Sequence, residues 1–331
     1  MIKGCGLDLG TNMIVYAAMD EEDKPIYKKQ RDAFYRLTPK SEINAKSIKR
    51  ALEEKKASFI LDGSDFIIVG EDALLMANDR NDNARRPMSK GVLSPKEKDS
   101  LPMVKLLIKS VVGEGNKETP IVFSVPAAPV DSDFDIFFHT EIIKSYLFEI
   151  GFINPTPINE AFAVAFSELI DDGLNGLCLS FGAGMVNVVV CYEGDAVAQF
   201  SITRGGDWID SQAGKAVDEK ASLIQIEKEG GIDLINPGTN KMHEAIAVYY
   251  KILIKHSIDV ILYELKKAEL PFYRNSLPII VSGGLTLANG FVDLFKQEIK
   301  GREFPFGVKE VRRAEDPMTC VARGALLAST L

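Results

Sequence analysis

The chain has 331 residues, 46% of them hydrophobic and 26% charged, which is the composition of an ordinary globular protein of about two domains. Its formal net charge of -8 repels a phosphate backbone on average, so nucleic acid is not expected as the main partner. No apolar run approaches the roughly 20 residues that a membrane-spanning helix needs, so we expect no integral membrane segment and a cytoplasmic location.

The first half of the chain reads as strands followed by helices. Residues 4–18 alternate as a β-hairpin does around the turn Gly10-Thr11-Asn12. Apolar residues at helical spacing predict a helix within residues 94–112. The other elements expected here are two short strands within 59–69, a strand over 119–125, and helices over 139–150 and 159–169.

The second half repeats this outline, because it also opens with a hairpin, over residues 176–192, bent at the glycines 182 and 184. The following elements are expected to be a strand over 196–202, helices over 207–220 and 242–268, a strand over 278–282, a helix over 287–299, a strand over 308–311 and a helix over 317–330. Two such halves indicate an internal duplication and an α/β fold with parallel sheets flanked by helices.

The two hairpin turns have the chemistry of anion sites. Gly10 lets the backbone approach an oxyanion closely, and the N–H groups of Thr11 and Asn12 can point at it. Asp8 precedes this turn, where it could hold a hydrated Mg²⁺. The turn at Gly182 repeats the design, so the two hairpins could clamp a polyphosphate from both sides.

A third motif, Ile279-Ile280-Val281-Ser282-Gly283-Gly284-Leu285, is a strand that stops at paired glycines. Bare backbone at this point leaves room for a flat group such as a nucleobase.

The four cysteines lie in apolar stretches without CxxC spacing, which favours buried free thiols over a zinc site.

Together these motifs resemble the actin-like ATPase superfamily of actin, MreB and DnaK-type chaperones. GLDLGTN is similar to its first phosphate motif, LSFGAGMVNV to the second and IIVSGGLTLANGF to the adenosine motif. INEAFAVA and CVARGA resemble the two connecting helices, while GGDWID and the tail AEDPMTCVARGALLAS look most like prokaryotic actins such as MreB and MamK. The resemblance covers nearly the whole chain and implies a two-lobed actin-like fold with a ribonuclease H-like duplicated core.

The resemblance also implies the limits of the lobes and the position of the ligand. The first lobe would comprise residues 1–156, completed by a C-terminal helix over 317–331, and the second lobe residues 157–316. ATP or ADP with Mg²⁺ would lie in the cleft between them, with Asp8 at the metal. The residues expected around the nucleotide are Gly10, Thr11, Asn12, Gly182, Ala183, Gly184, Met185, Gly205, Gly206, Asp207, Gln225, Lys228, Gly283, Gly284 and Leu285.

Two departures from the family pattern concern the second phosphate motif and hydrolysis. Ser180 stands where the family usually has Asp, and Met185 where it has Thr or Ser, so metal and phosphate handling should be weaker. Hydrolysis needs a carboxylate that orients the attacking water. The family's position falls near Asp133 when aligned from the strand and at His139, with Glu141 close by, when aligned back from Gly151, and Asp131 and Asp135 are alternatives.

The leading functional hypothesis is an actin-like cytoskeletal protein that binds ATP with magnesium and self-associates head-to-tail into filaments. Ser180 and Met185 favour a second hypothesis, a nucleotide-binding regulator or scaffold that hydrolyses ATP slowly or not at all. A third is a small-molecule kinase with Asp131 or Asp133 as general base, against which the MreB-like tail argues.

Overall fold

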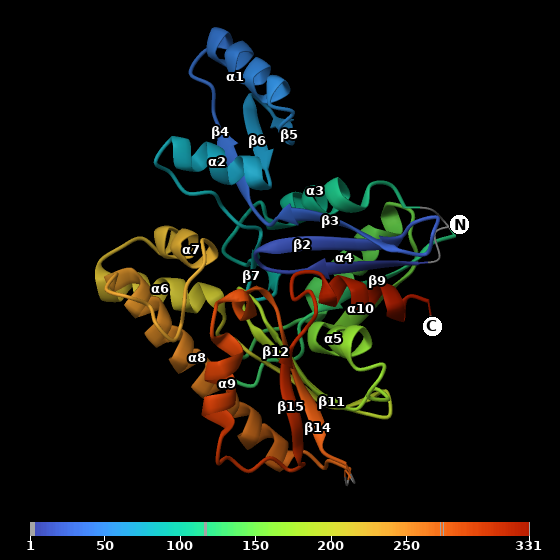
Figure 1. Cartoon of the computed structure of the whole chain (residues 1–331). Coiled ribbons are helices and arrows are strands. Elements are labelled where there is room, and N and C mark those ends of the chain that lie inside the picture. Colours follow the sequence, from blue (N-terminus) through green and yellow to red (C-terminus); the bar gives the residue numbers. More distant parts are fainter. Residues whose placement is uncertain (1–3, 116–117, 272, 274, 331) are drawn as a thin grey trace.

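The structure is a computed structural model that describes residues 4–115, 118–271, 273 and 275–330, and it shows two α/β lobes (Figure 1). The first lobe is built on a five-stranded sheet of order β10-β9-β1-β2-β3. The strand β1 is antiparallel to β2 and parallel to β9, which is parallel to β10. The strands are β1 (Cys5–Leu9), β2 (Met13–Met19), β3 (Pro25–Arg31), β9 (Pro120–Val125) and β10 (Ile153–Asn159).

The second lobe has the same topology, a sheet of order β13-β12-β11-β14-β15. Here β11 is antiparallel to β12 and parallel to β14. Asp8 pairs with Val15 in the first hairpin and Ser180 with Asn187 in the second, so Asp8 and Ser180 occupy equivalent positions. The expected duplication is therefore confirmed. The strands are β11 (Gly176–Phe181), β12 (Val186–Tyr192), β13 (Asp195–Ile202), β14 (Leu277–Ser282) and β15 (Val308–Arg313).

A small unit extends the first lobe at the top of Figure 1. It is a three-stranded antiparallel sheet of order β4-β6-β5 with two helices, followed by a two-stranded hairpin. Its elements are β4 (Phe34–Leu37), α1 (Glu42–Glu54), β5 (Phe59–Asp62), β6 (Asp65–Val69) and α2 (Glu71–Asp79). The hairpin that follows, β7 (Met88–Ser89) and β8 (Val92–Leu93), lies nearer the middle of the molecule. Only the strands at 59–69 were expected from the sequence.

The helices begin and end at recognisable residues. The Asn159 side chain accepts the N–H groups of Ala161 and Phe162 at the start of α5, and Asn240 caps α8 in the same way. One expectation was wrong: residues 287–299 do not form one helix, because Gly290 (φ 80°) separates the 3₁₀ turn η1 (Gly284–Leu287) from α9. The helices are α3 (Ser100–Val112), α4 (Phe137–Glu149), α5 (Glu160–Glu168), α6 (Gly206–Val217), α7 (Ala221–Glu229), α8 (Lys241–Lys267), α9 (Phe291–Ile299) and α10 (Cys320–Ala328).

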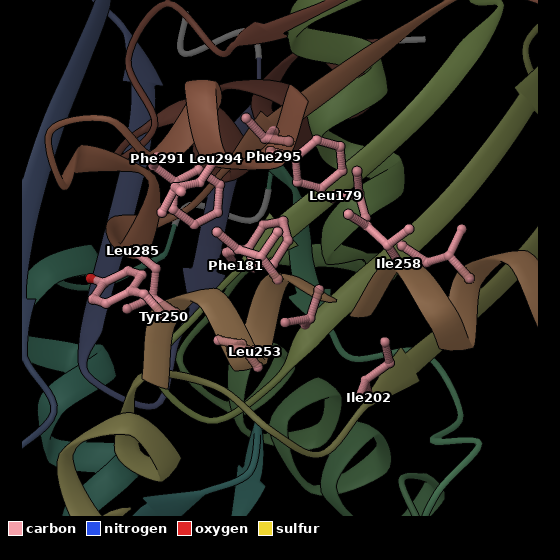
Figure 2. Close-up of a cluster of buried hydrophobic side chains, with 14 of the residues drawn as sticks. Leu179, Phe181, Ile202, Tyr250, Leu253, Ile258, Leu285, Phe291, Leu294 and Phe295 are labelled. Atoms are coloured by element: carbon pink, nitrogen blue, oxygen red, sulfur yellow. The ribbon is translucent and has the colours of Figure 1, made fainter. Parts of the chain in front are cut away.

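Aromatic residues in the core of the second lobe support the Gly-rich loop that follows β11. Phe181, the residue before Gly182, packs edge-to-face on Phe291 with ring centroids 5.0 Å apart, and Tyr250 of α8 contacts the same ring (Figure 2). Such aromatic pairs contribute about 1 kcal/mol each beyond the burial of their area. The loop is thereby tied to both α8 and α9.

Two glycines allow α10 to pass close to the first sheet and to α5. A Cβ on Gly324 would lie 1.7 Å from the carbonyl oxygen of Ala163, and one on Gly6 would lie 2.1 Å from that of Ala322. Figure 1 shows α5 and α10 side by side between the two lobes. Because neither approach tolerates a side chain, the backbones of β1, α10 and α5 form one closely packed unit.

The four cysteines are buried free thiols, as expected from the sequence. Within the described part of the chain no helix has the length and apolarity to cross a membrane. Nor do three or more His, Cys, Asp or Glu side chains of those residues gather into a metal-binding cluster.

Candidate functional site

A cavity of about 490 Å³ lies between the two lobes, a size typical of a small-molecule site. It is lined by loops of both hairpins and by the turn after β14. The residues expected at the ligand that line it are Asp8, Gly10, Thr11, Asn12, Gly182, Ala183, Gly184, Met185, Gly206, Asp207, Gln225, Lys228, Gly283, Gly284 and Leu285. Gly205 lies immediately behind the wall, where its Cβ would be 2.5 Å from the carbonyl oxygen of Ala183.

The two carboxylates expected to activate water lie elsewhere. Asp133 and Glu141 are exposed, and neither belongs to the residues that line the cavity. Asp131 accepts the N–H of Thr203 at 2.9 Å, which ties the loop before α4 to the end of β13. A role of Asp133 or Glu141 in hydrolysis therefore stays a prediction. It requires that this segment move toward the cavity; otherwise a different carboxylate must orient the water.

Two other carboxylates lie at the floor of the cavity. Asp8 accepts a hydrogen bond from the hydroxyl of Ser124 at 2.9 Å, and Glu160, only 9% exposed, accepts one from the Asn187 amide at 2.9 Å. Burial raises the pKa of both, and the negative charge of Asp8 raises the pKa of Glu160 further. Hydrogen bonds from Asn187 and Ser180 act on the pKa of Glu160 in the opposite direction. Two neighbouring buried carboxylates favour a proton or a cation between them.

One end of the cavity is apolar. It is formed by Leu285 and Leu287 of η1, by Ala288, and by Pro317 and Met318 before α10. Gly283 adopts φ 89°, and a Cβ there would lie 2.4 Å from the carbonyl oxygen of Phe181. Only glycine fits this position, so the turn brings bare backbone against the cavity.

A buried ion pair supports the wall of the second lobe. Lys228 of α7 donates to Asp210 of α6 at 2.6 Å and to the carbonyl oxygen of Gly206 at 3.1 Å. Burial raises the pKa of Asp210 to about 6, although the ammonium of Lys228 lowers it. Asp210 and Lys228 both line the cavity, so the ion pair forms part of its wall.

Polar side chains join the lobes across the cavity. Arg31 of β3 makes a bidentate pair with Glu229 of α7, at 3.1 Å for both bonds. Asn12 donates to Glu229 at 3.2 Å and accepts from Gln225 at 3.2 Å. We call Asn12, Arg31, Gln225 and Glu229 the polar clasp. All four line the cavity, so the clasp forms the part of its wall that spans the two lobes.

A second link between the lobes is the ion pair of Arg86 with Asp207, at 2.9 Å. Both charges act on the buried carboxyl group of Asp32. Asp32, fully buried, accepts the Met88 N–H at 3.2 Å, and its second oxygen has no partner among the described residues. Burial raises the pKa of Asp32 to about 8, although the charge of Arg86 lowers it.

This raised pKa predicts a pH dependence of stability. Between the unfolded value of 3.8 and the folded value of about 8, Asp32 binds a proton only in the folded state. The free energy of unfolding therefore falls as pH rises through that window, by up to about 1.4 kcal/mol per pH unit. Asp32→Asn should flatten this slope in urea unfolding between pH 5 and 7.5. Asp8 and Glu160 act equally on both proteins, so identical slopes would contradict the assignment.

Several residues of the cavity were not expected from the sequence. Glu160 lies in the INEAFAVA segment, next to the cap Asn159. An acidic residue in the first turn of a helix does not by itself indicate a functional site. Arg31 and Glu229 are 198 residues apart and only the tertiary structure brings them together. Asp210 stands within GGDWID, so the motif held a signal for it.

The equal topology of the two lobes and the glycine-lined cavity between them define an actin-like fold. Residues 3–329 match the Volactin family, and the chain belongs to this family. None of the curated proteins with which the sequence was compared matches it.

Solved structures support the fold over nearly the whole chain. A structure described as a MamK double helical filament is 20% identical, with a TM-score of 0.71 and coverage of 99% of this chain and 98% of that one. MreB 5 of Spiroplasma citri bound to AMPPNP is 17% identical, with a TM-score of 0.68 and coverage of 97% and 93%. The ethanolamine utilization protein EutJ from Carboxydothermus hydrogenoformans is 14% identical, with a TM-score of 0.56 and coverage of 98% and 89%. These similarities establish the fold alone.

Proposed function

We propose that this protein is a cytoplasmic actin-like cytoskeletal protein that binds ATP with Mg²⁺ in the cavity and assembles into filaments. The observation that carries the proposal is the wall of the cavity, in which two equivalent Gly-rich loops face each other and a third glycine turn adjoins an apolar end. Backbone N–H groups freed by glycine suit phosphates, and the apolar end suits a base. The MreB 5 structure that shares the fold holds AMPPNP.

The floor of the cavity fits a magnesium ion. Mg²⁺ keeps most of its water and uses one or two carboxylates together with the phosphates of a nucleotide. Asp8 and Glu160 supply two carboxylates whose mutual repulsion a divalent cation would relieve. Glu160 stands beside Ser180 and thus offers the negative charge that residue 180 lacks. When bound, the ion would neutralise phosphate charge.

Glu160 is also a second candidate for orienting the attacking water. It is buried, faces the cavity and has a raised pKa, which are features of a general base. Asp133 and Glu141 would need to approach the phosphates. Phosphate release is measured for Glu160→Gln and Asp133→Asn at saturating Mg²⁺ and ATP. Loss of release in Asp133→Asn assigns the water to Asp133, and loss in Glu160→Gln with unchanged Mg²⁺-ATP affinity assigns it to Glu160.

Filament assembly is supported by the fold and by a relative. The MamK structure that matches this chain over its whole length is a double helical filament. Head-to-tail contacts between copies of a two-lobed subunit are heterologous, and they produce filaments where the rotation between neighbours does not close into a ring.

The experiment follows light scattering and phosphate release together after ATP and Mg²⁺ are added to the purified protein. A rise in scattering with release supports a filament coupled to hydrolysis. Scattering without release means assembly without hydrolysis. If neither appears while ATP raises the melting temperature, the filament proposal is wrong.

That last outcome would favour the second candidate, a nucleotide-binding regulator or scaffold with little hydrolysis. Two observations favour it. Met185 is buried and offers a thioether where a hydroxyl would donate to phosphate. Ser180, equivalent to Asp8, contributes no charge to the metal site.

A further inference from the structure

The hairpin of β7 and β8 ends in a turn that lies between the two Gly-rich loops. The N–H of Gly91 donates to the hydroxyl of Thr11, in the first loop, at 2.9 Å. A Cβ on Gly184, in the second loop, would lie 2.9 Å from the Cα of Lys90 and 3.0 Å from the nitrogen of Gly91. The turn therefore touches both loops at the place where they meet.

The backbone of this turn does not favour lysine. The strands β7 and β8 are antiparallel with two residues between them, and Lys90 and Gly91 have φ values of 51° and 73°. These are the features of a type I′ turn, whose first position favours Asn, Asp or Gly. A lysine in the left-handed region costs free energy of roughly 1 kcal/mol. Asparagine at position 90 would therefore suit the turn better than lysine.

Gly91 lines the cavity, and its neighbour Lys90, which is not itself a lining residue, is a cation without a carboxylate partner among the described residues. It is exposed, and no described residue forms an ion pair with it. Arg31 and Lys228, which line the cavity, are already paired with Glu229 and Asp210.

The second loop shows which part of a nucleotide would meet Lys90. Gly182 and Ala183 accept hydrogen bonds from the N–H groups of Gly206 and Asp207, on the side of Leu285 and the apolar end. The loop then runs to Gly184, which contacts Lys90. A nucleotide with its base at the apolar end and its phosphates along the loop therefore has its last phosphate at the turn.

We infer that the ammonium group of Lys90 contacts the terminal phosphate of a nucleoside triphosphate and makes the site prefer triphosphate over diphosphate. The inference rests on the nucleotide-binding function proposed above and adds a specificity-determining residue to it. The flexible stem of lysine and its three donors suit a phosphate beyond both loops, and a charge-assisted bond there is roughly twice as strong as a neutral one.

The test compares AMPPNP and ADP, each with Mg²⁺, by calorimetry on the wild type, Lys90→Asn and Lys90→Arg. Lys90→Asn should weaken AMPPNP binding about tenfold or more, change ADP binding less than about threefold, and leave the melting temperature of the ligand-free protein equal or higher, since Asn suits the turn. Lys90→Arg should restore most of the preference for AMPPNP.

The matched control is Lys56→Asn. Lys56 is an exposed lysine with φ 55° that follows α1, so the variant makes the same change of charge and backbone preference away from the cavity. It should bind both nucleotides as the wild type does. Equal affinities of wild type and Lys90→Asn, or equal losses for both nucleotides, would overturn the inference alone. A wild type that binds neither nucleotide would overturn the proposed function as well.

Discussion

Replacing Gly324 by alanine is expected to lower the free energy of unfolding by about 3 kcal/mol, although alanine is the better helix former by about 1 kcal/mol. The added methyl group would lie 1.7 Å from the carbonyl oxygen of Ala163. That oxygen belongs to the backbone of α5, so no side chain can rotate away and the two helices must separate. Denaturant unfolding of wild type and variant measures the loss.

Gly230→Ala serves as the matched control. Gly230 has a right-handed helical conformation at the end of α7, and an added Cβ would come no closer than 3.3 Å to a backbone atom, the carbonyl oxygen of Ile226. Its stability should stay within about 0.5 kcal/mol of the wild type. If Gly324→Ala were as stable as this control, α10 and α5 would not pack as closely as described.

Asp8→Asn is expected to have opposite effects on ATP binding with and without Mg²⁺. With Mg²⁺, loss of a carboxylate at the metal should weaken ATP binding at least tenfold, or roughly 1.4 kcal/mol. With a chelator present, removal of a negative charge beside the phosphates should leave ATP binding equal or tighter. Fluorescence titration with an ATP analogue under both conditions measures the two effects.

Asp133→Asn is the control for this experiment, since Asp133 is exposed and outside the cavity wall. Its ATP affinity should match that of the wild type under both conditions. Should Asp8→Asn lose affinity equally with and without Mg²⁺, Asp8 would support the loop and not the metal.

The sequence predicted those parts of the site whose backbone requires particular residues. Gly283 adopts a conformation that only glycine accepts easily, and Gly184 meets Thr11 and Lys90 too closely for a side chain. Such positions have a visible local signature, and the cavity lies where these motifs predicted it. The repeated hairpins likewise predicted the duplicated topology, because each hairpin is local in the chain.

The parts missed have no local signature. The strand β3 has the sequence PIYKKQR and is largely exposed, so its charged residues leave no alternation of apolar and polar positions that would predict a strand. The helix α7 buries only Ile224, which leaves no apolar periodicity to detect. Glu160 and the clasp residues Arg31 and Glu229 acquire their roles from partners far along the chain, and single-sequence patterns do not reveal such pairs.

The polar clasp would affect the dissociation rate of a ligand more than its equilibrium affinity. Arg31 and Glu229 bridge the lobes with or without contact to a ligand, so a molecule entering or leaving on that side must wait until their two bonds break. Contacts deeper in the cavity would then set the binding equilibrium of a ligand, while the clasp would set its dissociation rate. Because the Arg31–Glu229 pair is only partly exposed, salt would weaken it modestly, and the rate at which an assembling subunit exchanges its ligand would rise with ionic strength.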